Sequence, residues 1–243
     1  MTAPTGRLGI IVHRLVALST ALLVASALGA PLVAHGQRVE PVVVAPETAR
    51  ASSFEFRAGG VYQLGERNYL FSGALKSSVG TVTGAEVMTR WRYVGFTVRT
   101  FDAHFGDQPE VVTGDATLLL GPPGFSVLAG YGKRAISSAL ATQVYSYAKF
   151  GAQSVIAIGG TGVRATIGGA AYSPLGVDKD RMTKGLEGET SVIYTPAGSK
   201  FYLMVGYRVE LVTTRTSGAS GAAMLSEELR GMRAGIGLQF GGR

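Results

Sequence analysis

Residues 200–212, read as KFYLMVGYRVELV, alternate strictly between two kinds of side chain. Phe201 and Leu203 begin a face that carries no charge, whereas Arg208 and Glu210 lie on the opposite face and carry both signs of charge. Because successive side chains of a β-strand point to opposite sides, this alternation predicts a strand with one apolar face and one polar face.

The same alternation recurs in ten segments. The predicted strands cover residues 53–63, 82–92, 94–104, 112–120, 125–136, 144–158, 163–173, 187–196, 200–212 and 229–240. An all-β fold, a closed antiparallel up-and-down barrel, is favoured because closure leaves no strand edge unpaired. Segments 112–120 and 144–158 alternate least cleanly, so an eight-stranded barrel is the alternative.

The connections between these segments are long and short in turn. The short ones cover residues 92–93, 121–124, 159–162 and 196–199, and the long ones cover residues 64–81, 105–111, 137–143, 174–186 and 213–228. Short turns at one end and long loops at the other are typical of bacterial outer-membrane barrels, whose short turns face the periplasm. An even number of strands then predicts that both termini are periplasmic.

The polarity of the two faces distinguishes a transmembrane barrel from a soluble barrel of the lipocalin type. In a soluble barrel the apolar face points inward, whereas in a membrane barrel it points to lipid. The apolar faces carry essentially no charge, and aromatic residues gather near the short turns, as in a girdle at a membrane boundary. This predicted aromatic girdle contains Phe54, Phe56, Trp91, Phe96, Phe125, Tyr194, Phe201 and Phe240. We therefore predict a transmembrane barrel.

In that arrangement the opposite faces line the lumen with eight bases and five acids. The bases are Arg57, Arg90, Arg99, Arg134, Lys149, Arg164, Arg208 and Arg233, and the acids are Glu55, Glu86, Asp115, Glu189 and Glu210. A ten-stranded barrel is not much wider inside than its own side chains, so paired charges can fill it. The pattern favours a salt-bridge network that fills the lumen. The alternative is a narrow, anion-favouring pore lined by unpaired arginines.

Glycine accounts for 35 of the 243 residues, about twice the usual ~7% share. Most of these glycines lie inside the alternating segments rather than in linkers. Glycine within a strand suits tight barrel curvature and close packing beneath bulky lumen side chains.

The N-terminus has the features of a secretory signal. Arg7 and Arg14 precede the apolar stretch 15–34, and Ala34-His35-Gly36 is a small-x-small cleavage site. We predict a signal peptide over residues 1–36, a periplasmic tether over 37–51 and the barrel over 52–243. Cleavage lowers the formal charge from +7 to +5. An uncleaved inner-membrane anchor is the alternative. Cysteine is absent, which excludes a lipoprotein and a disulfide framework.

The last segment ends on an aromatic residue. Its apolar face contains Met232, Ala234, Ile236, Leu238 and Phe240. This segment resembles the C-terminal strand of small bacterial outer-membrane β-barrel proteins, and the resemblance implies that location and architecture in a Gram-negative-type bacterium. The expected partners are outer-membrane lipid, lipopolysaccharide and the barrel-assembly machinery, with a monomer as the default.

No motif identifies an enzyme or a cofactor. His104 is the only histidine beyond the predicted signal peptide, and with Asp102 and Asp107 nearby a rim enzyme is the remote alternative. The stretch 178–180 lacks the later ligands of a calcium loop, so no metal site is predicted. Basic residues are spread over the strand faces, which argues against nucleic-acid binding. The predicted function is a structural or loop-mediated interaction role.

Overall fold

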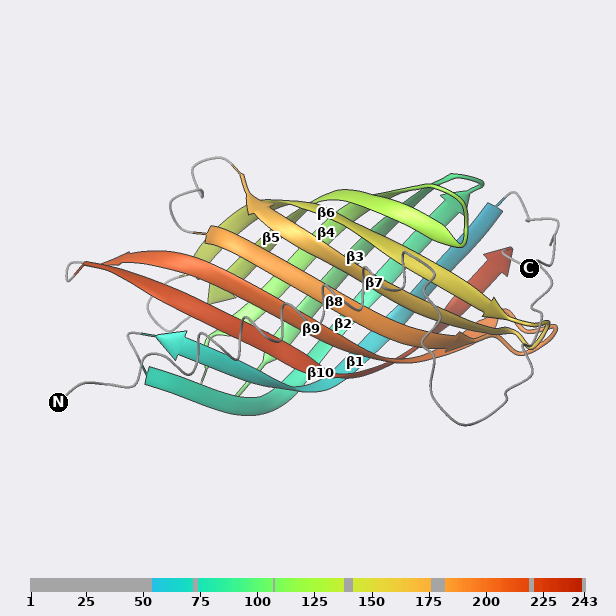
Figure 1. Cartoon of the computed structure of the whole chain (residues 1–243). Helices are drawn as coiled ribbons and strands as arrows, with labels where there is room; N and C mark the ends of the chain where they lie inside the picture. The colour runs from blue at the N-terminus through green and yellow to red at the C-terminus, as the bar shows by residue number, and fades with distance from the viewer. Residues whose placement is uncertain are drawn as a thin grey trace, which may run out of the picture. The chain divides into compact units, whose positions relative to one another are not determined.

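Ten antiparallel strands follow one another around a closed barrel, and β1 pairs with β10 to complete it (Figure 1). The computed structural model describes residues 54–71, 74–106, 108–137, 142–175, 182–218 and 221–241. The strands are β1 (Phe54–Phe71), β2 (Ala74–Trp91), β3 (Val94–His104), β4 (Glu110–Leu120), β5 (Phe125–Ser137), β6 (Thr142–Ile158), β7 (Val163–Pro174), β8 (Met182–Tyr194), β9 (Phe201–Gly218) and β10 (Gly221–Gly241). The predicted ten-stranded barrel is confirmed, and the eight-stranded alternative is wrong.

The predicted signal peptide and tether, residues 1–36 and 37–51, lie outside the described residues. Within the described ranges, no helix is long and apolar enough to cross a membrane.

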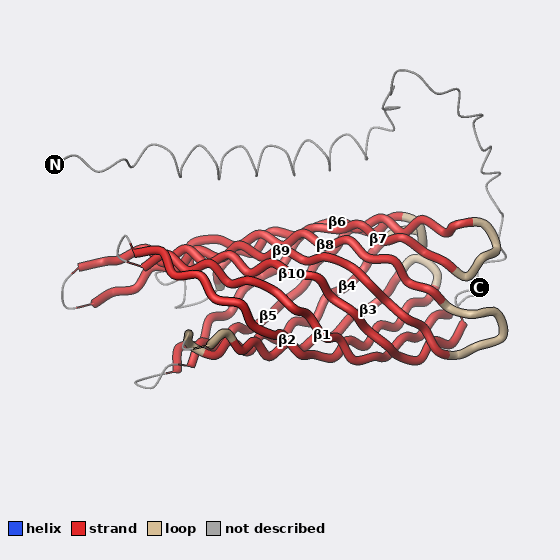
Figure 2. Tube along the Cα trace, turned by 90° about the horizontal axis from the view of Figure 1, so that it is seen from below, coloured by secondary structure: helices blue, strands red, loops and turns tan. Residues whose placement is uncertain are grey.

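The barrel has two different ends. At the turn end, the strands are joined by residues 92–93, 121–124, 159–162 and 195–200. At the hairpin end, the joining residues are 72–73, 105–109, 138–141, 175–181 and 219–220. Strand β1 begins at the turn end and β10 ends there (Figures 1 and 2).

The hairpin end differs from the sequence prediction. Strand residues occupy much of three segments that were predicted to be long loops, namely residues 64–81, 174–186 and 213–228. β1 and β2, for example, stay paired as far as Phe71 and Ala74. The alternation fades there because the outer face becomes polar at Glu66 and Arg230, although backbone pairing continues. Because the backbone pairing continues, β1, β2, β9 and β10 are 18 to 21 residues long, and they extend past the other strands of the barrel (Figure 1).

The barrel wall separates an apolar outer surface from a charged interior. On β3, Phe96 and Val98 are 44% and 45% exposed, whereas Arg99 is 8% exposed. On β9, Val205 is 57% exposed and Arg208 is 2% exposed. This polarity is opposite to that of a soluble barrel, as the sequence predicts.

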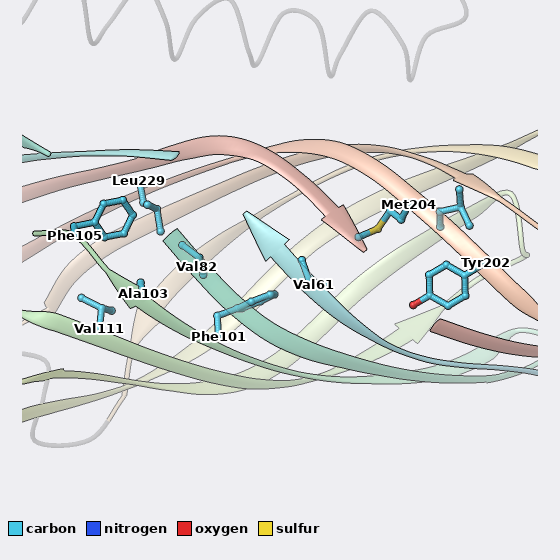
Figure 3. Close-up of a cluster of buried hydrophobic side chains, with 10 residues drawn as sticks. Val61, Val82, Phe101, Ala103, Phe105, Val111, Tyr202, Met204 and Leu229 are labelled. Atoms are coloured by element: carbon cyan, nitrogen blue, oxygen red, sulfur yellow. The ribbon is translucent and has the colours of Figure 1, made fainter. Parts of the chain in front are cut away.

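Aromatic rings inside the barrel pack over glycines of the neighbouring strand. Tyr147 lies opposite Gly132, where an added Cβ would collide with the tyrosine ring. The same arrangement pairs Phe101 with Gly84, Tyr172 with Gly185, and Tyr202 with Gly237. Figure 3 shows Phe101 and Tyr202 among the buried apolar side chains inside the barrel. Glycine is therefore required wherever a ring of the adjacent strand must lie flat against the wall.

Candidate functional site: the charged lumen

Twelve charged side chains from nine strands form one connected ion-pair network inside the barrel. The bases are Arg67, Arg99, Arg134, Lys149, Arg208 and Arg233, and the acids are Glu86, Asp115, Glu187, Glu189, Glu210 and Glu227. All of them occupy inward-facing positions of the strand alternation. With six bases and six acids the network is formally neutral.

Glu187 is the centre of this network. Its carboxylate lies 3.0 Å from an Arg99 guanidinium nitrogen, 3.1 Å from Lys149 Nζ and 3.0 Å from an Arg208 guanidinium nitrogen. The Tyr172 hydroxyl donates a hydrogen bond to the same carboxylate. Three cations around one carboxylate require further acids, and the two arms of the network provide them.

The first arm leads toward the hairpin end. Glu210 lies between Arg208, at 3.3 Å, and Arg134, at 2.7 Å. Glu227 lies between Arg134, at 2.8 Å, and Arg67, at 2.5 Å. Each acid is thus shared by two bases, and all five side chains are almost completely buried.

The second arm leads toward the turn end. Arg99 contacts Asp115 at 3.2 Å and Glu189 at 3.4 Å. Glu189 also lies 2.6 Å from Arg233, which reaches Glu86 at 3.8 Å. The outer part of this arm is less tightly closed, because Glu189 and Glu86 are 18% and 21% exposed, whereas both acids of the first arm are 3% exposed.

Three of the ion pairs cross the whole lumen. Arg99 on β3 meets Glu187 and Glu189 on β8, and Arg134 on β5 meets Glu227 on β10. In the ring of ten strands, each of these pairs of strands is five positions apart in either direction, so the partners come from opposite walls. The network therefore joins opposite sides of the barrel.

A smaller cluster lies at the turn end. Glu55 pairs with Arg164 at 2.8 Å and with Arg57 at 3.6 Å. Arg90 donates hydrogen bonds to the Ser126 hydroxyl and to backbone carbonyls of the turns. Among the described residues this cluster contains three bases and one acid, and two of the bases pair with that acid, so the cluster has an excess of two positive charges.

A cavity of about 80 Å³ lies between the network and this cluster. Its wall contains Arg57, Arg99, Lys149 and Glu187 together with the hydroxyls of Thr97, Thr117, Thr166 and Ser191. Other parts of its wall are apolar and include Leu119, Ile193 and Met204, and the polar groups on the wall together with the volume suit a few water molecules.

All thirteen lumen residues predicted from the sequence lie on the inner face and are buried or half-buried. Twelve of them take part in the ion pairs described above, and Arg90 is held by hydrogen bonds alone. Sequence reasoning missed Arg67, Glu187 and Glu227. Arg67 and Glu227 fell in predicted loops, although both continue the inward parity of their strands. Extending the parity by a few residues would have included Arg67 and Glu227, whereas Glu187 already has the inward parity at the first position of the predicted strand 187–196.

The eight residues of the predicted aromatic girdle lie on the outer face at the turn end. Seven are well exposed, and Phe56 is half-buried with its ring 6.2 Å from that of Phe240. Farther from the turns, Tyr62, Tyr131 and Tyr207 are also exposed on the outer surface.

At the hairpin end, His104 lies on the outer face between two carboxylates. Its imidazole is 3.2 Å from Asp102 and 3.5 Å from Glu110. Sequence reasoning considered Asp102 but not Glu110, which the β3–β4 pairing brings to the site. Asp107 lies outside the described residues.

The barrel has structural counterparts among solved bacterial proteins. Neisserial surface protein A is 14% identical over 78% of this chain and 98% of its own, with a TM-score of 0.36. The N-terminal β-barrel domain of Pseudomonas aeruginosa OprF is 15% identical over 75% and 97%, with a TM-score of 0.31. Pseudomonas aeruginosa OprG is 13% identical over 79% and 97%, with a TM-score of 0.32. No family model and no curated protein matches the sequence.

Proposed function

We propose that this protein is an integral outer-membrane β-barrel with a closed lumen, and that it has a structural or interaction role carried by its hairpin end. The observation that carries the proposal is the neutral ion-pair network, in which Arg99–Glu187 and Arg134–Glu227 join opposite walls. Buried charges that neutralise one another in this way fill the space an ion would need to pass.

The outer surface supports insertion into a bilayer. On β10, the outward positions from Phe240 to Met232 are uncharged, and Arg230 is the next outward residue. These nine residues match the about 9–11 that a tilted strand needs to cross the hydrocarbon layer. Aromatic residues border this apolar band at the turn end, as they do at membrane boundaries.

This orientation defines the partners we propose. The apolar band contacts outer-membrane lipid, and the charged outward residues of the hairpin end, such as Glu66 and Arg230, lie among lipopolysaccharide headgroups. The turn end and both termini are periplasmic after export with the signal peptide. The barrel-assembly machinery inserts the chain, which works as a monomer without a cofactor.

The proposal is tested by single-channel recording of the refolded protein in a planar bilayer. We expect no steady conductance from protein that circular dichroism shows to be folded. Reproducible openings of uniform size in the wild type would overturn the closed-lumen proposal.

A narrow anion-favouring pore is the second candidate, because the turn end has two excess positive charges next to a polar cavity. Anion-selective reversal potentials in asymmetric salt, abolished by charge reversal at Arg99 or Arg208, would support this pore instead of the closed barrel.

A further inference from the structure

The β3–β4 hairpin brings three metal-ligating side chains together at the hairpin end. Asp102 and His104 are two residues apart on β3 and therefore share its outer face. Glu110 is the first residue of β4 and continues the pairing that joins Ala103 to Val111. One donor atom from each of the three lies within 4.8 Å of the other two.

The neighbouring residues do not neutralise the two carboxylates. The Oδ1 atom of Asp102 is shielded from solvent and has no hydrogen-bond partner, although the side chain as a whole is 43% exposed. The adjacent strands place Thr81, Thr83 and Ser137 beside the three residues, and none of these is a base. Among the described residues, no lysine or arginine forms an ion pair with Asp102 or Glu110. The two carboxylates therefore offer a bound cation two negative charges that no described lysine or arginine neutralises.

We propose that Asp102, His104 and Glu110 bind a divalent transition-metal ion of the Zn²⁺ type. One imidazole nitrogen and two carboxylates form a mixed nitrogen and oxygen set, which suits Zn²⁺ better than Ca²⁺, an ion that prefers oxygen ligands alone. Zinc bonds of about 2.0–2.1 Å in a tetrahedron separate the ligand atoms by about 3.3 Å. In the structure Nε2 of His104 lies 3.2 Å from Asp102 and Nδ1 lies 3.5 Å from Glu110, so the donor atoms are already near one another but are not yet arranged around one point.

The site needs only a small rearrangement to close on an ion. The two ring nitrogens of His104 face different carboxylates, so one carboxylate has to turn toward the nitrogen that binds the metal. The Glu110 side chain can make this movement, because it is 46% exposed. Three protein ligands leave a fourth position for water or for an oxygen of an anionic group in the surroundings.

The test is calorimetric titration of ZnCl₂ into the full chain, purified without an affinity tag in detergent micelles, with CaCl₂ titrated in parallel. We expect one Zn²⁺ site that His104→Ala weakens by more than about tenfold, since the loss of groups that merely support a ligand already costs about that much. Asp102→Asn and Glu110→Gln should each weaken the same site. Glu228→Gln, at another outward acid of the hairpin end, is the matched control and should leave it unchanged.

Two further measurements test whether the metal ion binds through His104 and whether each variant has folded. Co²⁺ titration should produce visible absorption in the wild type that is absent in His104→Ala. The heat-modifiable mobility of each variant on a gel checks that the barrel has formed. Zn²⁺ binding that is absent, or equal in folded wild type and His104→Ala, would overturn the proposal. So would a Ca²⁺ affinity as high as that for Zn²⁺, or an equal loss in Glu228→Gln.

Discussion

Charged side chains differ in burial and pairing between the two halves of the lumen. From Glu187 toward the hairpin end, the paired side chains are 1% to 6% exposed, and every acid contacts at least two bases. At the turn end, Glu55, Arg57 and Arg164 are 14% to 18% exposed, and the described cluster contains three bases for one acid. We call the part of the lumen from Glu187 to the hairpin end the closed half, and the part at the turn end the open half. The charges of the closed half are tightly paired, whereas the open half borders a cavity and has a positive excess.

This difference follows from the cost of removing charges from water. A fully buried ion must be paired and hydrogen-bonded, because isolated burial costs several kcal/mol. An ion that still reaches water keeps part of its hydration, so an excess of arginine is tolerated at the turn end. Arginine and glutamate side chains therefore fill the half near the hairpin end as buried ion pairs, whereas at the turn end they line the lumen and remain partly hydrated.

The largest expected effect comes from removing the centre of the network. Glu187→Ala leaves Arg99, Lys149 and Arg208 buried without their shared carboxylate, which should lower the free energy of unfolding by about 3–5 kcal/mol. Glu55→Ala in the open half should cost clearly less. Urea unfolding of both variants in liposomes measures the difference, and equal losses would contradict the contrast between the two halves.

A second substitution pair tests the wall that encloses both halves. Val205 faces outward and Met204 faces the lumen beside the cavity. Val205→Arg should destabilise the inserted barrel by about 2–4 kcal/mol if the site is near the bilayer midplane. Met204→Arg should do far less, because its side chain reaches the polar cavity. Folding yields in liposomes compare the two, and similar tolerance at both positions would reverse the assignment of the faces.

Packing in the closed half is tested at a glycine. Gly132→Ala forces the Tyr147 ring away from the wall, and overpacking of this kind costs about 1–3 kcal/mol. Gly60 on the outer face is the matched control, since a Cβ there meets only a carbonyl oxygen at 3.9 Å. Gly60→Ala should therefore be nearly neutral in the same unfolding experiment. Equal costs would mean that the two alanines disturb the backbone rather than the ring packing.

The smallest expected effect concerns an exposed pair beyond the apolar band. Hydrogen bonds from Arg230 and Ser77 hold the pKa of Glu66 below its usual value of 4.5. A lowered folded-state pKa means that the stabilisation is complete above pH 4.5 and is lost as the pH falls through the lowered value. The wild type should therefore lose this stabilisation between pH 7 and pH 3, whereas Glu66→Gln has none to lose. The difference between the unfolding midpoints at pH 7 and pH 3 should be slightly smaller for the variant. A variant with an unchanged difference would show that the pair contributes nothing.

Much of the fold could be predicted because strand alternation is a local property. The parity of Val205 and Arg208 already assigns one to the outer face and the other to the lumen, whatever the strand's neighbours are. The prediction failed where that local signal ended. From Glu66 and Arg230 onward, charged and polar residues interrupt the apolar outer face. Strand continuation there depends on backbone pairing, which leaves no mark in the hydrophobic pattern.

By itself, therefore, the sequence determined the outward and inward faces and the kinds of charge in the lumen, and it favoured ten strands over eight. Only the tertiary structure decided which charges meet. Arg99 and Glu187 are 88 residues apart and come together because closure of the barrel places β3 opposite β8. Glu110 joins Asp102 and His104 through strand register in the same way. Side-chain direction is set residue by residue, whereas partnership across a lumen or a hairpin is set by closure and register, which are properties of the whole chain.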